Sequence, residues 1–145
     1  MTAIPEVLDA LTTIWKNAQP AGLRPDQVYD GPVVEYVGTE GVAVGASAED
    51  LSVEFAQPGT DVGGGSGERA TVTCLVWAGS GDTVFKPLRD RVDAVIDALE
   101  QALAADRSLG DVVSHAWLTS GVLSQLQTGR GALVRAEIRV TVTRL

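Results

Sequence analysis

The segment from Ala132 to Leu145 constrains the fold of this chain most strongly. Between Val134 and Thr143 it alternates strictly between apolar and polar side chains. Alternation with a period of two is typical of a β-strand that buries one face and exposes the other. A strand of this length has to be a main member of a sheet, and the apolar face of that sheet needs a second layer of structure to cover it.

Two amphipathic segments can supply that layer. Residues Ile4–Ala18 place apolar side chains three and four positions apart, and a proline and a glycine follow as stop signals. A longer helix is predicted over Thr83–Ala105, with an apolar stripe and with its charged residues mostly off that stripe. In this helix Arg89 and Asp93 have the i, i+4 spacing of an ion pair that contributes about 0.2–0.5 kcal/mol.

Further β-strands are predicted in the rest of the chain, bounded by glycine, proline and short polar residues. The dipeptide Ser120-Gly121 predicts a turn between two of them, and Gly129-Arg130-Gly131 predicts another turn before the last strand. The predicted strands are Val28–Asp30, Val33–Val37, Val42–Ala46, Leu51–Ala56, Glu68–Ala78, Val112–Thr119 and Val122–Thr128.

The order of these elements is one helix, several strands, one long helix and three strands. It predicts an α+β fold in which a mixed, mainly antiparallel sheet carries the N-terminal helix and the long helix on one face. A chain of 145 residues fits one domain, 1–145, and is long enough to bury a core without a disulfide or a metal.

The segment Gln57–Gly67 contains five glycines in eleven residues. It is predicted to form an exposed, mobile loop within the domain, Pro58–Gly67, rather than a linker between domains. No Lys-Ser or Lys-Thr pair follows the glycines, so the segment lacks the pattern of a phosphate-binding loop. It is either a flexible hairpin tip or a loop that becomes ordered on a partner.

The charge of the chain is negative and unevenly distributed. The net charge of −8 argues against a free-standing nucleic-acid binder and against binding to an anionic membrane surface. Residues 26–68 contain nine acids and no base, whereas residues 112–145 contain four arginines and one glutamate. The two segments are either two ordinary solvated faces or complementary surfaces, the acidic middle of one copy meeting the basic end of another.

The sequence offers no catalytic or metal-binding constellation. His115 is the only histidine and is expected to be a strand or surface residue, and Cys74 is the only cysteine and is expected in the core. The acid pairs and clusters are expected to be solvated, and the three tryptophans are expected in core and rim packing. We therefore expect no enzyme activity, no cofactor and no metal. A single cysteine and the lack of a signal peptide or membrane span favour the cytoplasm.

The part of the chain from Phe85 to Leu145 carries a family resemblance. It comprises the helix Phe85–Leu99, the tripeptide Leu109-Gly110-Asp111, the segments Trp117–Gly121 and Leu123–Ala132, and the final alternating strand. This pattern resembles the tail terminator and tail-completion proteins (minor tail proteins) of long-tailed phages with actinobacterial hosts. The N-terminal part agrees in outline, with a helix followed by Val-Tyr-Asp-Gly before short strands.

The resemblance implies a small α+β subunit that forms a homo-hexameric ring at the head-proximal end of the tail tube. Such a ring ends tube polymerisation and joins the tail to the head. Its partners would be further copies of itself, the tail tube protein and the head–tail connector or neck protein. Genome DNA would pass through the ring without specific binding, no membrane would be involved, and the subunit would assemble in the host cytoplasm and end in the virion.

Two surfaces are candidate interfaces in that setting. The glycine-rich loop would be a contact arm to the tube or the neck, through Asp61, Val62, Gly63, Gly64 and Gly65. Arg135 and Arg139 would meet the acidic middle of a neighbouring copy. Two alternatives remain open: a connector, neck or tail tube subunit of the same machine, and a small enzyme or ligand-binding domain unrelated to phages.

Overall fold

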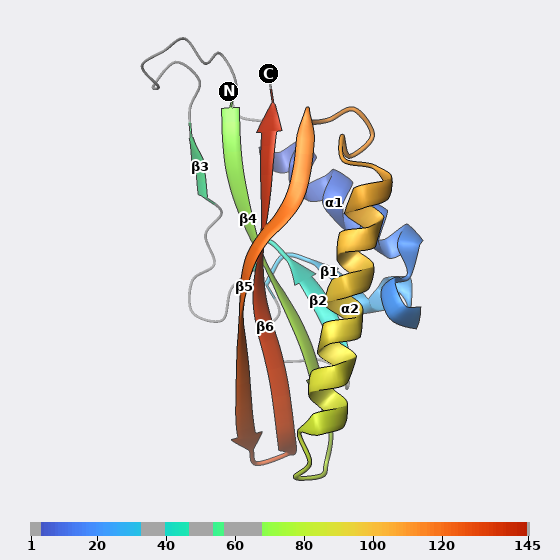
Figure 1. The fold of residues 1–145 in the computed structure, drawn as a ribbon, viewed down its shortest axis with the longest axis vertical. Coiled ribbons are helices and arrows are strands. Elements are labelled where there is room, and N and C mark those ends of the chain that lie inside the picture. Colours follow the sequence, from blue (N-terminus) through green and yellow to red (C-terminus); the bar gives the residue numbers. More distant parts are fainter. Residues whose placement is uncertain (1–3, 33–39, 47–53, 57–67, 145) are drawn as a thin grey trace.

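A computed structural model describes residues 4–32, 40–46, 54–56 and 68–144 of the chain. These residues form two α-helices, two single-turn 3-10 helices and one six-stranded sheet (Figure 1). The helices are α1 (Ile4–Ala18), η1 (Pro20–Gly22), η2 (Pro25–Gln27) and α2 (Lys86–Ala105). The strands are β1 (Val28–Asp30), β2 (Glu40–Val44), β3 (Glu54–Ala56), β4 (Glu68–Gly79), β5 (His115–Thr128) and β6 (Gly131–Arg144).

The sheet is mixed and mainly antiparallel, as predicted. Its strand order is β1-β2-β4-β6-β5, and β3 pairs with β4 beside β2. Only β1 and β2 run parallel; the other described pairs are antiparallel. The two longest strands, β5 and β6, form a hairpin that runs the length of the molecule beside α2 (Figure 1).

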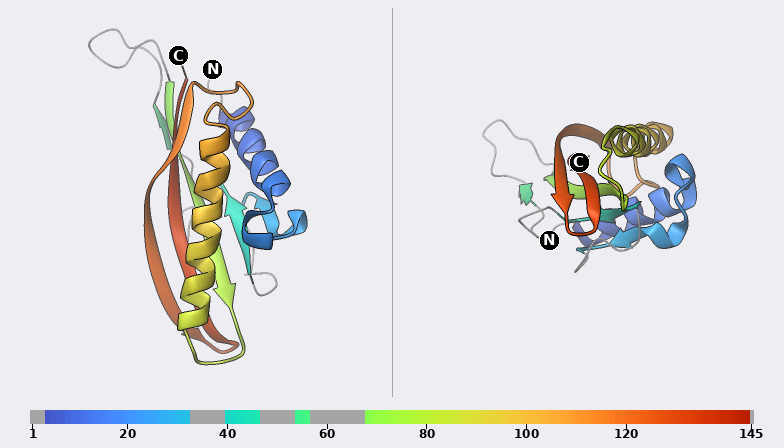
Figure 2. Two further views of the ribbon diagram at one scale, coloured as in Figure 1. Left: turned by 45° about the vertical axis from the view of Figure 1, so that its right-hand side comes forward. Right: turned by 90° about the horizontal axis from the view of Figure 1, so that it is seen from below.

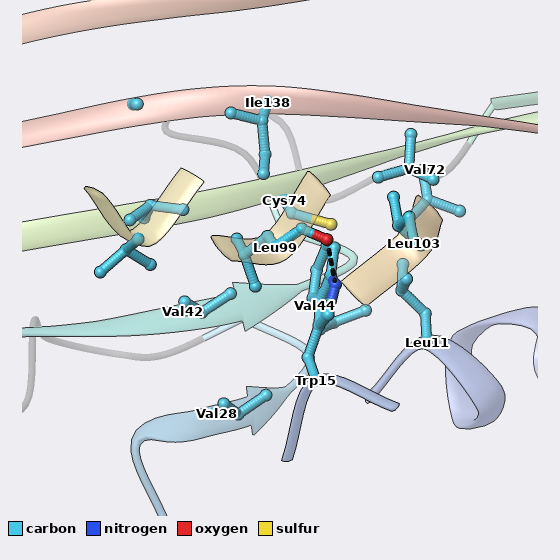
Figure 3. Packing of buried hydrophobic residues seen from close by; sticks show 14 of the residues in the cluster. Leu11, Trp15, Val28, Val42, Val44, Val72, Cys74, Leu99, Leu103 and Ile138 are labelled. Atoms are coloured by element: carbon cyan, nitrogen blue, oxygen red, sulfur yellow. Dashed lines mark hydrogen bonds between the residues drawn. The ribbon is translucent and has the colours of Figure 1, made fainter. Parts of the chain in front are cut away.

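Both helices cover the same face of the sheet, which also confirms the prediction (Figure 2). The apolar side of β6 and the apolar stripes of α1 and α2 meet in one buried cluster. Trp15 from α1 is fully buried in it, and its indole Nε1 donates a hydrogen bond to the Leu99 carbonyl oxygen of α2 at 3.3 Å (Figure 3). This hydrogen bond gives the indole N–H a partner, while the rest of the Trp15 side chain packs among apolar residues. Cys74 lies in the same cluster.

The opposite face of the sheet, called the open face below, also buries apolar side chains. Leu75 and Trp77 point to this face from β4 and are 4% and 1% exposed. The Trp77 ring stacks on Tyr29, with ring centroids 5.7 Å apart. Gly41 pairs with Trp77 across β2 and β4, and a Cβ atom on Gly41 would lie 2.5 Å from Trp77 Cζ2. The glycine therefore provides the space into which the indole fits.

A bidentate ion pair that the sequence analysis did not predict joins α2 to β2. Arg91 Nε and Nη2 donate to the two carboxylate oxygens of Glu40 at 2.6 and 2.9 Å. Arg91 Nη1 donates to the Ala21 carbonyl oxygen at 2.6 Å, so the same side chain also holds η1. Hydrogen bonding to Glu40 raises the pKa of the Arg91 guanidinium above its ordinary value.

Several boundaries differ from the predicted ones. The long helix begins at Lys86 rather than Thr83, because Pro87 fits only the first helical turn. The predicted Arg89–Asp93 pair is wrong: Arg89 donates to Gln125 at 2.9 Å, and the i, i+4 pair of this helix is Lys86–Asp90 at 2.8 Å.

Corrections also apply to the strands. Residues 112–114 lie in a turn, where Leu109 and Asp111 have left-handed φ values of 52° and 68°, so β5 starts only at His115. The predicted strands Val28–Asp30 and Glu68–Ala78 are confirmed within one residue. Of the predicted strand Leu51–Ala56, residues 54–56 form β3 and the others lie outside the described residues, as do Val33–Val37 and Gln57–Gly67.

The turn predicted at Ser120-Gly121 is wrong. Residues 115–128 form one continuous strand, whose pairing with β6 shifts register between Leu118 and Ser120. Thr119 is the extra residue of this β-bulge, and its Oγ1 lies 3.2 Å from the Arg139 carbonyl oxygen and 3.2 Å from Thr141 Oγ1. A bulge interrupts the alternation of side chains just as a turn does in sequence, which explains the error.

Candidate interaction surface along the outer edge of β5

The two arginines of the candidate interface lie in β6 on the open face. Arg135 pairs with Trp77 of β4 and Ser124 of β5, and it is partly buried. Arg139 pairs with Thr73 and Ser120 and is exposed. Glu137 stands between them on the same face, so the row carries two positive charges and one negative charge. Arg139 is the arginine that a neighbouring molecule could reach most directly.

The other candidate interface residues, Asp61, Val62, Gly63, Gly64 and Gly65, lie outside the described residues. The structure therefore does not place the glycine-rich contact arm relative to Arg139.

The strand next to these arginines, β5, forms one edge of the sheet. Within the described part of the chain it pairs with β6 alone. Its fourteen residues contain no proline, aspartate, glutamate, lysine or arginine. Charged residues and prolines are the usual means by which an edge strand avoids pairing with another chain. The long β5 edge lacks both.

The first part of this edge is occupied by side chains from α2 and the turn that follows it. Arg107 Nη1 donates to the Ala116 carbonyl oxygen at 3.2 Å, and Glu100 Oε2 accepts from the Leu118 N–H at 3.3 Å. Arg107 and Glu100 also pair with each other at 2.9 Å. The outward backbone groups of Ala116 and Leu118 therefore already have partners, and this stretch cannot accept another strand.

We call residues 115–118 the guarded part of β5. The bulge at Thr119 separates it from the rest of the strand. It inverts the alternation, because Ala116 and Leu118 face the helices, whereas beyond the bulge Leu123 faces them and Val122 turns to the open face. Val122 is 58% exposed and Leu123 is 50% exposed. We call residues 120–128 the open segment of β5. In it two apolar side chains lie exposed on opposite faces of an edge.

The residues that could have supported catalysis are placed as structural or surface residues. Cys74 is fully buried, and this burial raises the pKa of its thiol to about 12. His115 is exposed at the start of β5 and lies against the half-buried Trp117, with ring centroids 5.0 Å apart. No group of three metal-ligating side chains occurs among the described residues. Asp90 and Asp97 contact Lys86 and Gln101 on the exposed side of α2.

An open hollow of about 510 Å³ lies between α1 and the turn after α2. Three carboxylates line it, those of Glu6, Asp9 and Asp106, over a floor that includes Ile14 and Leu109. Asp106 accepts hydrogen bonds from the Ser108 hydroxyl and the Gly110 N–H, so it serves the turn itself.

No protein-family model matches the chain, and no curated protein matches it significantly in sequence. Neither of the described helices combines the length and apolar character that crossing a lipid bilayer requires.

Proposed function

We propose that this chain is a structural virion protein that forms a closed ring at the head-proximal end of a phage tail tube. In this role it ends tube polymerisation and joins the tail to the head, with the tube protein on one side and the connector or neck protein on the other. It acts by binding protein surfaces and not as an enzyme.

The observation that carries the proposal is the open segment of β5. It is an uncharged, accessible strand edge with exposed Val122 and Leu123, and such edges are sites where one protein chain adds to the sheet of another. An assembly subunit needs a surface of this kind. The sequence resemblance of residues 85–145 to tail terminator proteins then supplies the class of assembly.

The acidic character of the chain agrees with this role. With a net charge of −8, a ring of such subunits repels nucleic acid rather than gripping it. DNA that has to pass through a ring during packaging or ejection moves more freely when the protein does not bind its phosphates. The proposal therefore includes the passage of DNA without a specific DNA contact.

The decisive experiment is deletion of the gene from the phage that encodes it, followed by electron microscopy of the particles. We expect overlong tails, or tails of normal length that never join heads, and the length defect is the more specific of the two. Filled heads with no tail tube would instead assign the chain to the tube, and normal infectious particles would refute a role in the virion.

A further inference from the structure

The outer edge of β5 changes character at the bulge. Before it, Arg107 and Glu100 occupy the outward groups of Ala116 and Leu118. Beyond it, β5 still pairs only with β6 among the described residues, and none of its side chains carries a charge. A protected edge would carry lysine, proline or a covering element along its whole length. The protection stops where Val122 and Leu123 become exposed.

We propose that the open segment of β5 is the contact through which one copy of this chain adds to the sheet of the next copy, head to tail. This inference rests on the proposed ring and names the surface that closes it. Backbone hydrogen bonds would extend the sheet from copy to copy, and the neighbour would cover Val122 on one face and Leu123 on the other.

Charge identifies the surface on the neighbouring copy. The edge opposite to β5 is formed by β1, on which Asp30 is exposed. The β5–β6 hairpin belongs to the segment 112–145, with four arginines and one glutamate. A head-to-tail contact brings Asp30 of one copy toward the basic β5–β6 hairpin of the next copy, on which Arg139 is exposed.

A two-fold contact between two β5 strands is the competing arrangement. It would place the arginine-containing hairpins of both copies side by side, which is unfavourable because the charges are alike. It would also close as a dimer, whereas a head-to-tail contact generates a ring when the rotation closes. The charge distribution therefore favours the head-to-tail contact.

The first test places lysines in the open segment. In the double variant Val122→Lys, Leu123→Lys we expect the purified protein to lose its assembled state and to elute as a single chain in size-exclusion chromatography with light scattering. The control is His115→Lys, an exposed position in the guarded part of β5, and it should assemble like the wild type. Assembly of the double variant, or a wild type that stays monomeric at low ionic strength, would overturn the inference.

The second test separates the two arrangements. Single cysteines at Val122, Ser124 or Leu126 lie on the same face near the middle of the open segment. In a two-fold β5 contact, the cysteine nearest to the two-fold axis would lie close to the same cysteine of the other copy. Oxidation would then give a disulfide-linked dimer, whereas a head-to-tail contact gives none. The buried native Cys74 does not interfere. A specific disulfide dimer in any of the three variants would overturn the head-to-tail arrangement.

The third test concerns charge. Arg139→Glu should weaken assembly, and the wild-type assembly should dissociate as salt is raised, because exposed ion pairs are screened. Unchanged assembly of Arg139→Glu, and also of Arg135→Glu with Arg139→Glu, would contradict the charge argument. These outcomes are independent of the deletion phenotype: tail-length defects together with an unaffected lysine variant would keep the proposed function and reject only this contact.

Discussion

Replacing Gly41 with alanine tests the close fit between β2 and the indole of Trp77. A Cβ atom at this position would lie 2.5 Å from Trp77 Cζ2, 2.8 Å from Cη2 and 3.1 Å from the Gln27 carbonyl oxygen. The indole is 1% exposed and stacks on Tyr29, so it cannot move away without disturbing that ring. Overpacking of a buried site costs about 1–3 kcal/mol. We expect Gly41→Ala to lower the free energy of unfolding by about 2 kcal/mol.

The assay is urea unfolding followed by far-ultraviolet circular dichroism, which does not depend on the tryptophan itself. A loss of about 2 kcal/mol would also lower the melting temperature by about 5–8 °C for a domain of this size. The matched control is Gly81→Ala, because a Cβ atom there would meet nothing within 4 Å. That variant should stay within about 0.5 kcal/mol of the wild type.

A double-mutant cycle identifies the clash as the cause. Trp77→Leu removes the atoms that a Cβ on residue 41 would meet, so Gly41→Ala should cost at least about 1 kcal/mol less in that background than in the wild type. If Gly41→Ala were as stable as Gly81→Ala, or equally harmful with and without Trp77, the argument from the close approach would be refuted.

Three further predictions concern other contacts of the core and the turns. Because burial raises the pKa of Cys74 from 9.0 to about 12, the folded state keeps a proton that the unfolded thiol loses, and stability should fall by about 1.4 kcal/mol per pH unit between those values. In urea titrations at alkaline pH, Cys74→Ala should remove this contribution to the fall of stability with pH. The same pH dependence in the variant and the wild type would contradict the raised pKa of Cys74. Glu40→Gln should cost about 1–2 kcal/mol in urea unfolding, and Arg91→Lys should be similarly harmful because lysine cannot replace the bidentate contact; full stability of the lysine variant would argue against this geometry. Gly131 has φ 119° and its Cβ would meet the Ser80 carbonyl oxygen, so Gly131→Ala should cost about 2 kcal/mol in thermal or urea unfolding, and a neutral effect would exclude the close approach.

Periodic segments made most of the fold predictable. The alternation of β6 and the apolar stripes of α1 and α2 each determine which side of the element is buried, and together they predict a sheet with both helices on one face. The expected packing of Trp77 in the core or rim is confirmed, but the burial of Leu75 and Trp77 on the open face was not predicted. A signal for it exists, because the apolar run Cys74-Leu75-Val76-Trp77 does not alternate, and such runs are typical of strands buried on both faces.

Other features had no local signal. Arg91 and Glu40 are 51 residues apart in the chain, and only the packing of α2 against the sheet and η1 brings them together. The sequence shows that residues 115–128 contain no aspartate, glutamate, lysine or arginine. It does not show that this strand lies at an edge of the sheet. The bulge at Thr119 interrupts the alternation of side chains in the sequence as a turn does. For this reason the sequence did not indicate that Val122 lies on the open face.

The two parts of β5 have separable roles in folding and in assembly. The guarded part is tied to the core, because Ala116 is buried and Glu100 and Arg107 bond its backbone to α2 and the turn after it. In the open segment Val122 and Leu123 are at least half exposed and contribute little to the core. Substitutions of exposed residues usually change stability by less than about 0.5 kcal/mol. Lysines at these two positions should therefore abolish assembly, and the urea midpoint should stay nearly unchanged when wild type and variant are compared as single chains at high salt. Glu100→Ala, in contrast, should lower the midpoint under the same conditions. If the lysine variant were also destabilised as a single chain, by as much as Glu100→Ala, the open segment would matter for folding and not for assembly alone.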